Sequence, residues 1–133
     1  MLGIDKEQSS VFDALSGYYA RTLSQIRLGL SPLRGQLFTF NITENPICPL
    51  CLDAFESDFH FFLECPVLEA KRINYMSELK LLVPNLQVLS KKELLALCLS
   101  GVKTLNSNTN IILLKQSINF VKISNRFTKE HLA

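Results

Sequence analysis

Three of the chain's four cysteines and one of its two histidines fall within the stretch CPLCLDAFESDFHFFLEC. The candidate ligands are Cys48, Cys51, His60 and Cys65, in the spacing C-x2-C-x8-H-x4-C. Structural zinc sites favour a closed tetrahedron of thiolate and imidazole ligands, and a C-x2-C turn followed by a second close pair supplies such a set. The neighbouring prolines favour the turn that aims the first two sulfurs at one point. The spacing therefore predicts a zinc site.

The predicted metal is structural rather than catalytic. Four protein ligands close the coordination shell, whereas a catalytic zinc needs an open position and a nearby acid or base. Glu64 is the glutamate nearest to a ligand, but it forms neither an H-x-E nor an H-E-x-x-H arrangement. We therefore expect no enzymatic activity and no small-molecule substrate.

The remaining cysteine and histidine are expected to play no part in the metal site. Cys98 lies in the apolar run LLALCLSG and is expected to pack in the core. His131 lies close to the end of the sequence and is expected to be solvated. Two alternatives to a metal site stay open, namely cysteines that only fill a core and two disulfides in a secreted protein.

The composition favours one compact, intracellular domain. The chain has 133 residues, of which 47% are hydrophobic, enough to form a core. The opening MLGIDKEQSS carries charges where a signal peptide would be apolar. No apolar stretch approaches the roughly 20 residues that span a bilayer. We expect a nuclear or cytoplasmic protein with reduced thiols and no membrane partner.

The charges are distributed unevenly, although the net charge is only +2. Residues 14–43 hold three arginines and no acid, and residues 103–133 hold five basic residues and one acid. Between them, residues 44–65 hold five acids and no base: Glu44, Asp53, Glu56, Asp58 and Glu64. Basic segments therefore flank an acidic, cysteine-rich middle.

Hydrophobic periodicity predicts helices over residues 11–30, 68–83 and 110–129, with residues 104–110 as a polar connector. Ser9 or Ser10 is the expected N-cap of the first helix, within which Gly17 would be unfavourable. A further helix is expected in SKKELLALCLSG. Ser90 and Glu93 have the capping-box spacing that marks its start, and Gly101 stands where it should end.

Two shorter segments complete the expected elements. Ser57 or Asp58 is expected to cap a short helix that carries His60. The segment LRGQLFTFNI fits either a helical turn or a strand, and we favour a helix. The predicted fold is thus all-α, a small helical domain stapled by a Cys-Cys-His-Cys zinc knuckle. It spans residues 1–133, with an N-terminal helical segment (11–43), the knuckle (44–66) and a helical C-terminal part (67–133).

The sequence resembles a known family over roughly residues 20–127. RLGLSPLRGQLFTFNI, CPLC, ESDFHFFLECP and INFVKISNRF are similar to the C-terminal segment of non-LTR (LINE-type) retrotransposon reverse transcriptases. In that family an R-x-G-x-S-x-L stretch precedes a zinc knuckle that ends in H-F-x-x-x-C-P. The matching residues are Arg27, Gly29, Ser31, Leu33, Cys48, Cys51, His60, Phe61, Cys65 and Pro66.

The resemblance implies a module that helps a larger enzyme hold its RNA template and target DNA. The chain has no adjacent aspartate pair of the kind that binds catalytic magnesium in a polymerase, and it has no room for a polymerase domain. The resemblance therefore implies a zinc-binding, nucleic-acid-binding module without polymerase activity of its own. The alternative is a zinc-stapled structural or protein-interaction domain that has no nucleic-acid role.

Any contact with RNA or DNA is expected from the basic flanks, because phosphate neutralisation dominates affinity and the knuckle has no base. The expected nucleic-acid-binding residues are Arg21, Arg27, Arg34, Lys71 and Arg72. Two acids of the knuckle, Asp53 and Glu56, are expected to oppose binding. Phe38, Phe40 and Phe59 either offer stacking surfaces to unpaired bases or belong to the core.

Overall fold

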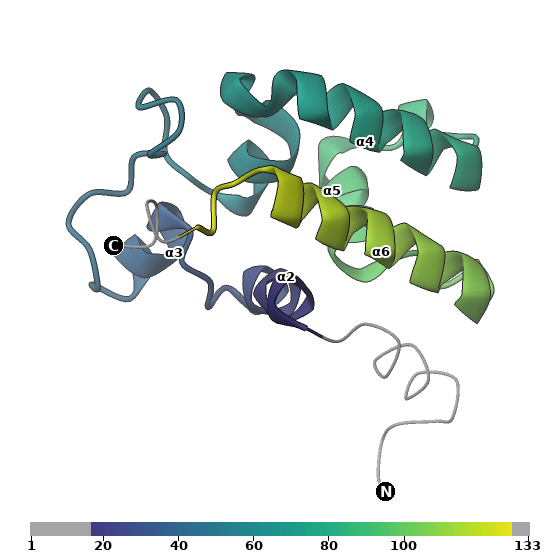
Figure 1. Cartoon of the computed structure of the whole chain (residues 1–133), viewed down its shortest axis with the longest axis horizontal. Coiled ribbons are helices and arrows are strands. Elements are labelled where there is room, and N and C mark those ends of the chain that lie inside the picture. Colours follow the sequence, from purple (N-terminus) through teal and green to yellow (C-terminus); the bar gives the residue numbers. More distant parts are fainter. Residues whose placement is uncertain (1–16, 129–133) are drawn as a thin grey trace, which may run out of the picture.

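The computed structural model describes residues 17–128 (Figure 1). The predicted N-cap at Ser9 or Ser10, the first part of the helix predicted over residues 11–30, and His131 lie outside the described residues. The elements are α2 (Tyr18–Leu28), α3 (Arg34–Thr39), the π-helical η1 (His60–Glu64), the 3-10 helix η2 (Pro66–Leu68), α4 (Glu69–Leu82), the 3-10 helix η3 (Leu86–Val88), α5 (Lys91–Ser100) and α6 (Ser107–Ile123).

The described part of the chain confirms the predicted all-α fold. Within residues 17–128 the only β-type pairing is an isolated bridge between Ile47 and Phe55. Helix α6 packs against α4, α2 and α5, and Figure 1 shows it between α4 and α2. In the same range, no helix combines the length and the apolar character needed to cross a bilayer.

Helix α2 ends at Leu28, before the end predicted at residue 30. Its C-cap is Gly29, which has the left-handed φ of 77° and donates its backbone N–H to the carbonyl of Ile26. Gly17, predicted to lie inside the helix, instead occupies the N-cap position with a φ of 110°. Glycine adopts such angles without the steric cost that a side chain would bring. Both glycines therefore mark helix boundaries.

The segment LRGQLFTFNI, which fitted either a helical turn or a strand, contains helix α3, as we favoured from the sequence. The predicted helix over residues 68–83 is confirmed as α4, and Tyr75 and Leu79 on it are buried. The predicted capping box is present at the start of α5, where Ser90 accepts from the backbone of Glu93 and the Glu93 carboxylate accepts from the backbone of Ser90. These elements follow directly from local signals.

Helix α6 differs from its prediction at both ends. It begins at Ser107 rather than residue 110, because the Asn106 side chain accepts the backbone N–H of Thr109 at 2.8 Å and acts as the N-cap. The helix ends at Ile123 rather than residue 129. Asn125 has a φ of 57°, which turns the chain away from the helical direction. The polar connector is therefore shorter than predicted.

A cluster of aromatic rings fixes η1 against α4 and α6. Phe61 and Phe62 of η1 are both buried, and their ring centroids lie 5.5 and 5.7 Å from that of Phe120 on α6. Tyr75 of α4 stacks on Phe120 at 4.8 Å and shares a 2.7 Å hydrogen bond with the Ser117 hydroxyl. Because η1 carries His60, this core holds one side of the candidate site in place.

Candidate metal centre

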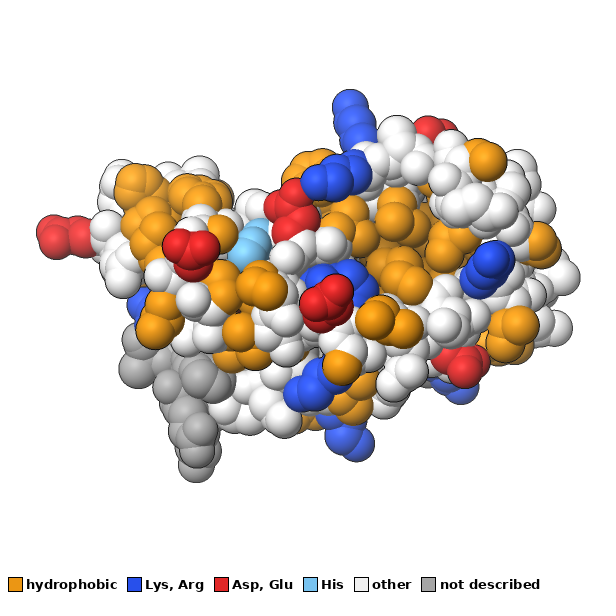
Figure 2. Space-filling model, turned by 90° about the horizontal axis from the view of Figure 1, so that it is seen from above, with side chains coloured by type: hydrophobic (Ala, Val, Ile, Leu, Met, Phe, Trp, Pro, Cys, Tyr) orange, Lys and Arg blue, Asp and Glu red, His pale blue; other side chains and the backbone are white. Residues whose placement is uncertain are grey.

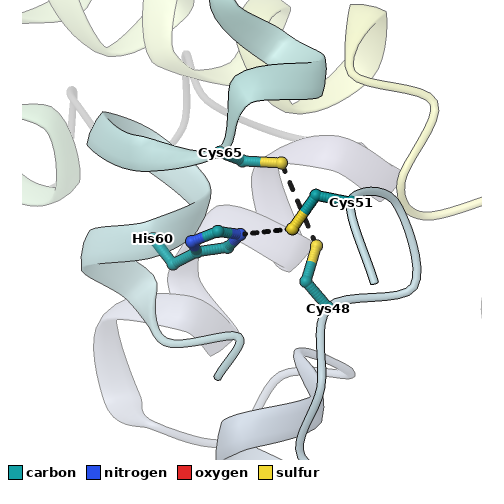
Figure 3. A group of neighbouring side chains, drawn as sticks. All are labelled: Cys48, Cys51, His60 and Cys65. Carbon is teal, nitrogen blue, oxygen red and sulfur yellow. Dashed lines mark hydrogen bonds between the residues drawn. The ribbon is translucent and has the colours of Figure 1, made fainter. Parts of the chain in front are cut away.

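The structure brings together the four residues predicted to bind metal. One ligand atom from each of Cys48, Cys51, His60 and Cys65 lies within 4.8 Å of all the others. The sulfur of Cys51 lies 3.4 Å from Nε2 of His60, and the sulfurs of Cys48 and Cys65 lie 4.0 Å apart (Figure 3). Zn–S bonds of about 2.3 Å in a tetrahedron place sulfurs about 3.8 Å apart. The four side chains can therefore surround one metal ion.

A tight turn of the knuckle positions Cys48 and Cys51. The backbone N–H of Cys48 donates to Ala54, and that of Leu52 donates back to Cys48, at 2.8 and 2.9 Å. A further bond of 2.9 Å runs from the Glu56 N–H to the Pro46 carbonyl. These bonds form the turn that the neighbouring prolines predicted. Both cysteine side chains project from this turn toward η1 (Figure 3).

Helix η1 positions His60 and Cys65. The Ser57 hydroxyl accepts the backbone N–H of His60 at 3.0 Å, which confirms the predicted cap. The backbone N–H of Cys65 donates to the carbonyl of His60 at 2.7 Å, a span of five residues that defines a π-turn. Short π-helical segments are frequent at functional sites. The wider turn places both ligands on the side that faces Cys48 and Cys51.

Burial tunes the protonation of the cluster. It raises the pKa of the Cys48 thiol to about 12 and also raises that of Cys65. Backbone N–H groups directed at the two sulfurs act in the opposite sense, from Cys51 and Leu50 toward Cys48 and from Val67 toward Cys65. Burial lowers the pKa of His60, which favours the neutral imidazole that metals bind. The folded cluster thus favours neutral thiols and a neutral imidazole, and a thiophilic cation would bind with release of the thiol protons.

Cys98 lies outside the cluster, as predicted. It is fully buried in α5, and burial raises the pKa of its thiol to about 11. Such a thiol is inert and behaves as a small apolar side chain.

Arg72 supports the metal centre, a role not predicted from the sequence. Its guanidinium donates to the Phe62 carbonyl at 3.0 Å and to the Cys65 carbonyl at 2.7 Å. The side chain is half-buried, and burial lowers its pKa. Arg72 therefore ties α4 to η1 beside a ligand, and two of its five N–H donors are used within the fold.

Glu56 is a second residue whose role differs from the prediction. It was expected to oppose nucleic-acid binding at the surface, but both Glu56 and Arg126 are completely buried. The Arg126 guanidinium donates to the two carboxylate oxygens at 2.5 and 2.7 Å. The sequence did not indicate this burial, because Glu56 and Arg126 lie far apart in the chain and their ion pair leaves no local sequence pattern.

The basic residues predicted to contact nucleic acid do not form one cluster. Arg21 and Arg27 are exposed on α2, and Arg34 is half-buried at the start of α3. Lys71 is half-buried on α4, beside Arg72. Since α6 lies between α2 and α4, the arginines of α2 are separated from the pair on α4 (Figure 1).

An apolar groove of about 610 Å³ runs beside α4. Its lining includes Leu63, Met76, Leu86 and Leu94, with charges contributed by Glu69, Arg72 and Lys80. Figure 2 shows this face from the α4 side, with hydrophobic side chains gathered in a hollow and charged ones around it. Lys91 of α5 and Glu64 of η1 form an ion pair at 2.5 Å. Glu64 directly follows Leu63, which lines the groove.

Comparisons of the chain with protein-family models, with curated proteins and with solved structures gave no match. The fold and the site together define a helical domain with a Cys-Cys-His-Cys cluster that could hold a metal ion.

Proposed function

We propose that this chain is a zinc-binding domain in which the metal is structural. The convergence of the four donor atoms within 4.8 Å is the observation that carries the proposal. Three sulfurs and one imidazole nitrogen suit zinc, and they leave no coordination position for a substrate. When bound, zinc would join the knuckle turn to η1, two segments that the chain holds together with few backbone hydrogen bonds.

We further propose that the domain binds RNA or DNA, without polymerase activity of its own. The sequence resemblance to the C-terminal segment of non-LTR retrotransposon reverse transcriptases supports this function, as does the exposure of Arg21 and Arg27. We place the contacts mainly on α2, because its Arg21 and Arg27 are exposed whereas Arg72 is half-buried. Lys71 would add a contact only if the ligand reached around the molecule to α4.

Two measurements test this function together. Elemental analysis of protein purified without chelator should find one zinc per chain, and fluorescence anisotropy should find nucleic-acid binding that weakens as salt increases. Each lost phosphate contact lowers the slope of log K against log salt by about 0.7 to 0.9. Replacement of Arg21 and Arg27 by alanine should weaken binding and flatten the slope. The double variant Lys115→Ala with Lys122→Ala, at two exposed lysines of α6, serves as a charge-matched control. Salt-independent or absent binding would contradict the nucleic-acid role.

The apolar groove favours a second candidate function, protein interaction. A hollow of about 610 Å³ with an apolar lining is large enough to receive side chains from a partner. Met76→Glu would place a charge in the groove and should abolish such an interaction while leaving nucleic-acid binding unchanged. The two functions therefore respond to different substitutions.

A further inference from the structure

The surface around α3 and the knuckle exposes three phenylalanine rings. Phe38, Phe40 and Phe55 are 40%, 55% and 49% exposed, whereas Phe61 and Phe62 are 1% and 0% exposed. Exposed aromatic residues that gather in one place commonly mark a binding surface. Phe59, the third phenylalanine predicted from the sequence, is half-buried against the core and does not belong to this group.

Phe55 and Phe38 form a defined pair that bridges the knuckle and α3. Their ring centroids are 6.2 Å apart, and the planes meet at 87°. A Cβ atom at Gly35 would lie 2.4 Å from the Phe55 ring, so only glycine allows the ring to cross α3 there. The Gly35 N–H also donates to the Glu56 carbonyl at 2.9 Å. The pair is therefore held by the backbone and does not depend on chance side-chain contact.

Positive charge lies beside these rings. Arg34 precedes Phe38 by four residues, which places both on the same face of α3. The side chain of Gln36 donates to the Ile26 carbonyl at 3.0 Å, so α3 begins close to the end of α2 that carries Arg27. The buried pair with Arg126 removes Glu56 from this surface, which leaves Glu44, Asp53 and Glu64 as the exposed acids of the knuckle. Glu64 is paired with Lys91.

Phe40 follows Phe38 by two residues and is not part of this pair. We propose that Phe38 and Phe55 form a stacking platform for the unpaired bases of single-stranded RNA or DNA, with Arg27 and Arg34 directed to the phosphates. Any base has a flat face that stacks on an aromatic ring, but in a duplex the neighbouring base pairs cover that face. The platform rests on the proposed nucleic-acid-binding function and specifies the form of nucleic acid that it recognises. Because Phe55 belongs to the knuckle, the platform is complete only when the metal-binding segment is folded.

Leucine substitutions separate stacking from general apolar contact. The zinc-loaded full chain would be titrated against a fluorescein-labelled 20-nucleotide oligo-dT, an oligo-U of the same length and a duplex of mixed sequence. Phe38→Leu and Phe55→Leu should each weaken single-strand binding about tenfold, since stacking on one ring contributes on the order of a factor of ten. Phe38→Tyr retains a ring and should bind as the parent does.

A matched control and the duplex distinguish the possible failures. Leu81→Ala removes an apolar side chain of α4 that is 77% exposed, more than either ring, and should leave single-strand affinity unchanged. If the leucine variants bind single strands as tightly as the parent, the platform is disproved and the surface is an apolar protein contact, although salt-dependent binding to nucleic acid would still stand. If neither single strands nor duplex bind the parent at any salt concentration, the proposed function fails together with the platform.

Discussion

The carboxylate of Glu56 and the guanidinium of Arg126 form a doubly hydrogen-bonded ion pair in the interior, between residues 70 positions apart in the sequence. The same carboxylate accepts the backbone N–H of Arg34 at 2.6 Å, and Arg126 also donates to the carbonyl of Pro32 at 3.0 Å. The pair thus joins the knuckle, the start of α3 and the segment after α6. It joins these segments through contacts that do not involve the four candidate metal ligands.

Removal of one partner of this pair should be strongly destabilising. Arg126→Met leaves a buried carboxylate unpaired, and we expect the free energy of unfolding of the zinc-loaded protein to fall by about 3–5 kcal/mol. Urea denaturation followed by circular dichroism measures it. The double variant Glu56→Leu with Arg126→Met removes both charges and should recover much of the loss. A single variant that costs less than about 1 kcal/mol would show that the pair is not buried in solution.

Leu52 should be replaceable by glycine with a gain in stability. It has a φ of 58°, in the left-handed region, and its side chain is 76% exposed. A bulky residue in this conformation costs about 1–2 kcal/mol. Leu52→Gly should therefore raise the free energy of unfolding by up to about 1 kcal/mol after the entropy of glycine is counted. Leu52→Ala keeps the Cβ and should show no such gain; equal effects of the two substitutions would count against backbone strain.

Chelation should unfold the knuckle and spare α6. The metal-binding free energy becomes folding free energy when no site exists in the unfolded segment. In hydrogen exchange, amides of residues 44–66 should lose at least about tenfold protection after zinc removal, whereas the amides of α6 should change much less. Cys98→Ala should leave the zinc content at one per chain, since this thiol lies away from the cluster. Equal protection of the knuckle with and without zinc would contradict a stapling role.

Tyr75 should limit stability at high pH. Burial, followed by the influence of the Cys98 thiol, raises its pKa well above the ordinary value of 10.0. The neutral phenol is favoured in the folded state, so its contribution is complete below pH 10 and is lost as the pH rises beyond that value. Tyr75→Phe should therefore lose less stability between pH 9 and 11 than the parent. Parallel pH profiles for the two proteins would show that Tyr75 ionises freely in the fold.

Local sequence signals predicted much of the fold and all four candidate metal ligands. Periodicity located α4, Ser90 and Glu93 marked the start of α5, and the ligand spacing identified a set that the structure brings together. Asn106 was misread for a physical reason, because the asparagine and serine residues that are typical of loops also cap helices. The predicted start of α6 at residue 110 was therefore later than the observed start at Ser107.

Tertiary relationships were beyond the reach of sequence patterns. Neither the π-turn from His60 to Cys65 nor the burial of Glu56 with Arg126 has a local signature, and both depend on what packs around them. Arg72 was predicted to contact nucleic acid because it is basic and follows the knuckle. Its hydrogen bonds to the carbonyls of Phe62 and Cys65 depend instead on the approach of α4 to η1.

X-ray absorption spectroscopy at the zinc edge tests the central claim most directly. Protein purified without chelator should give a four-coordinate spectrum with three sulfur neighbours at about 2.3 Å and one nitrogen neighbour at about 2.0–2.1 Å. His60→Cys should convert it to four sulfur neighbours, and Cys98→Ala should leave it unchanged. A spectrum dominated by oxygen neighbours, or protein that retains no zinc, would contradict the assignment of Cys48, Cys51, His60 and Cys65 as a structural zinc site.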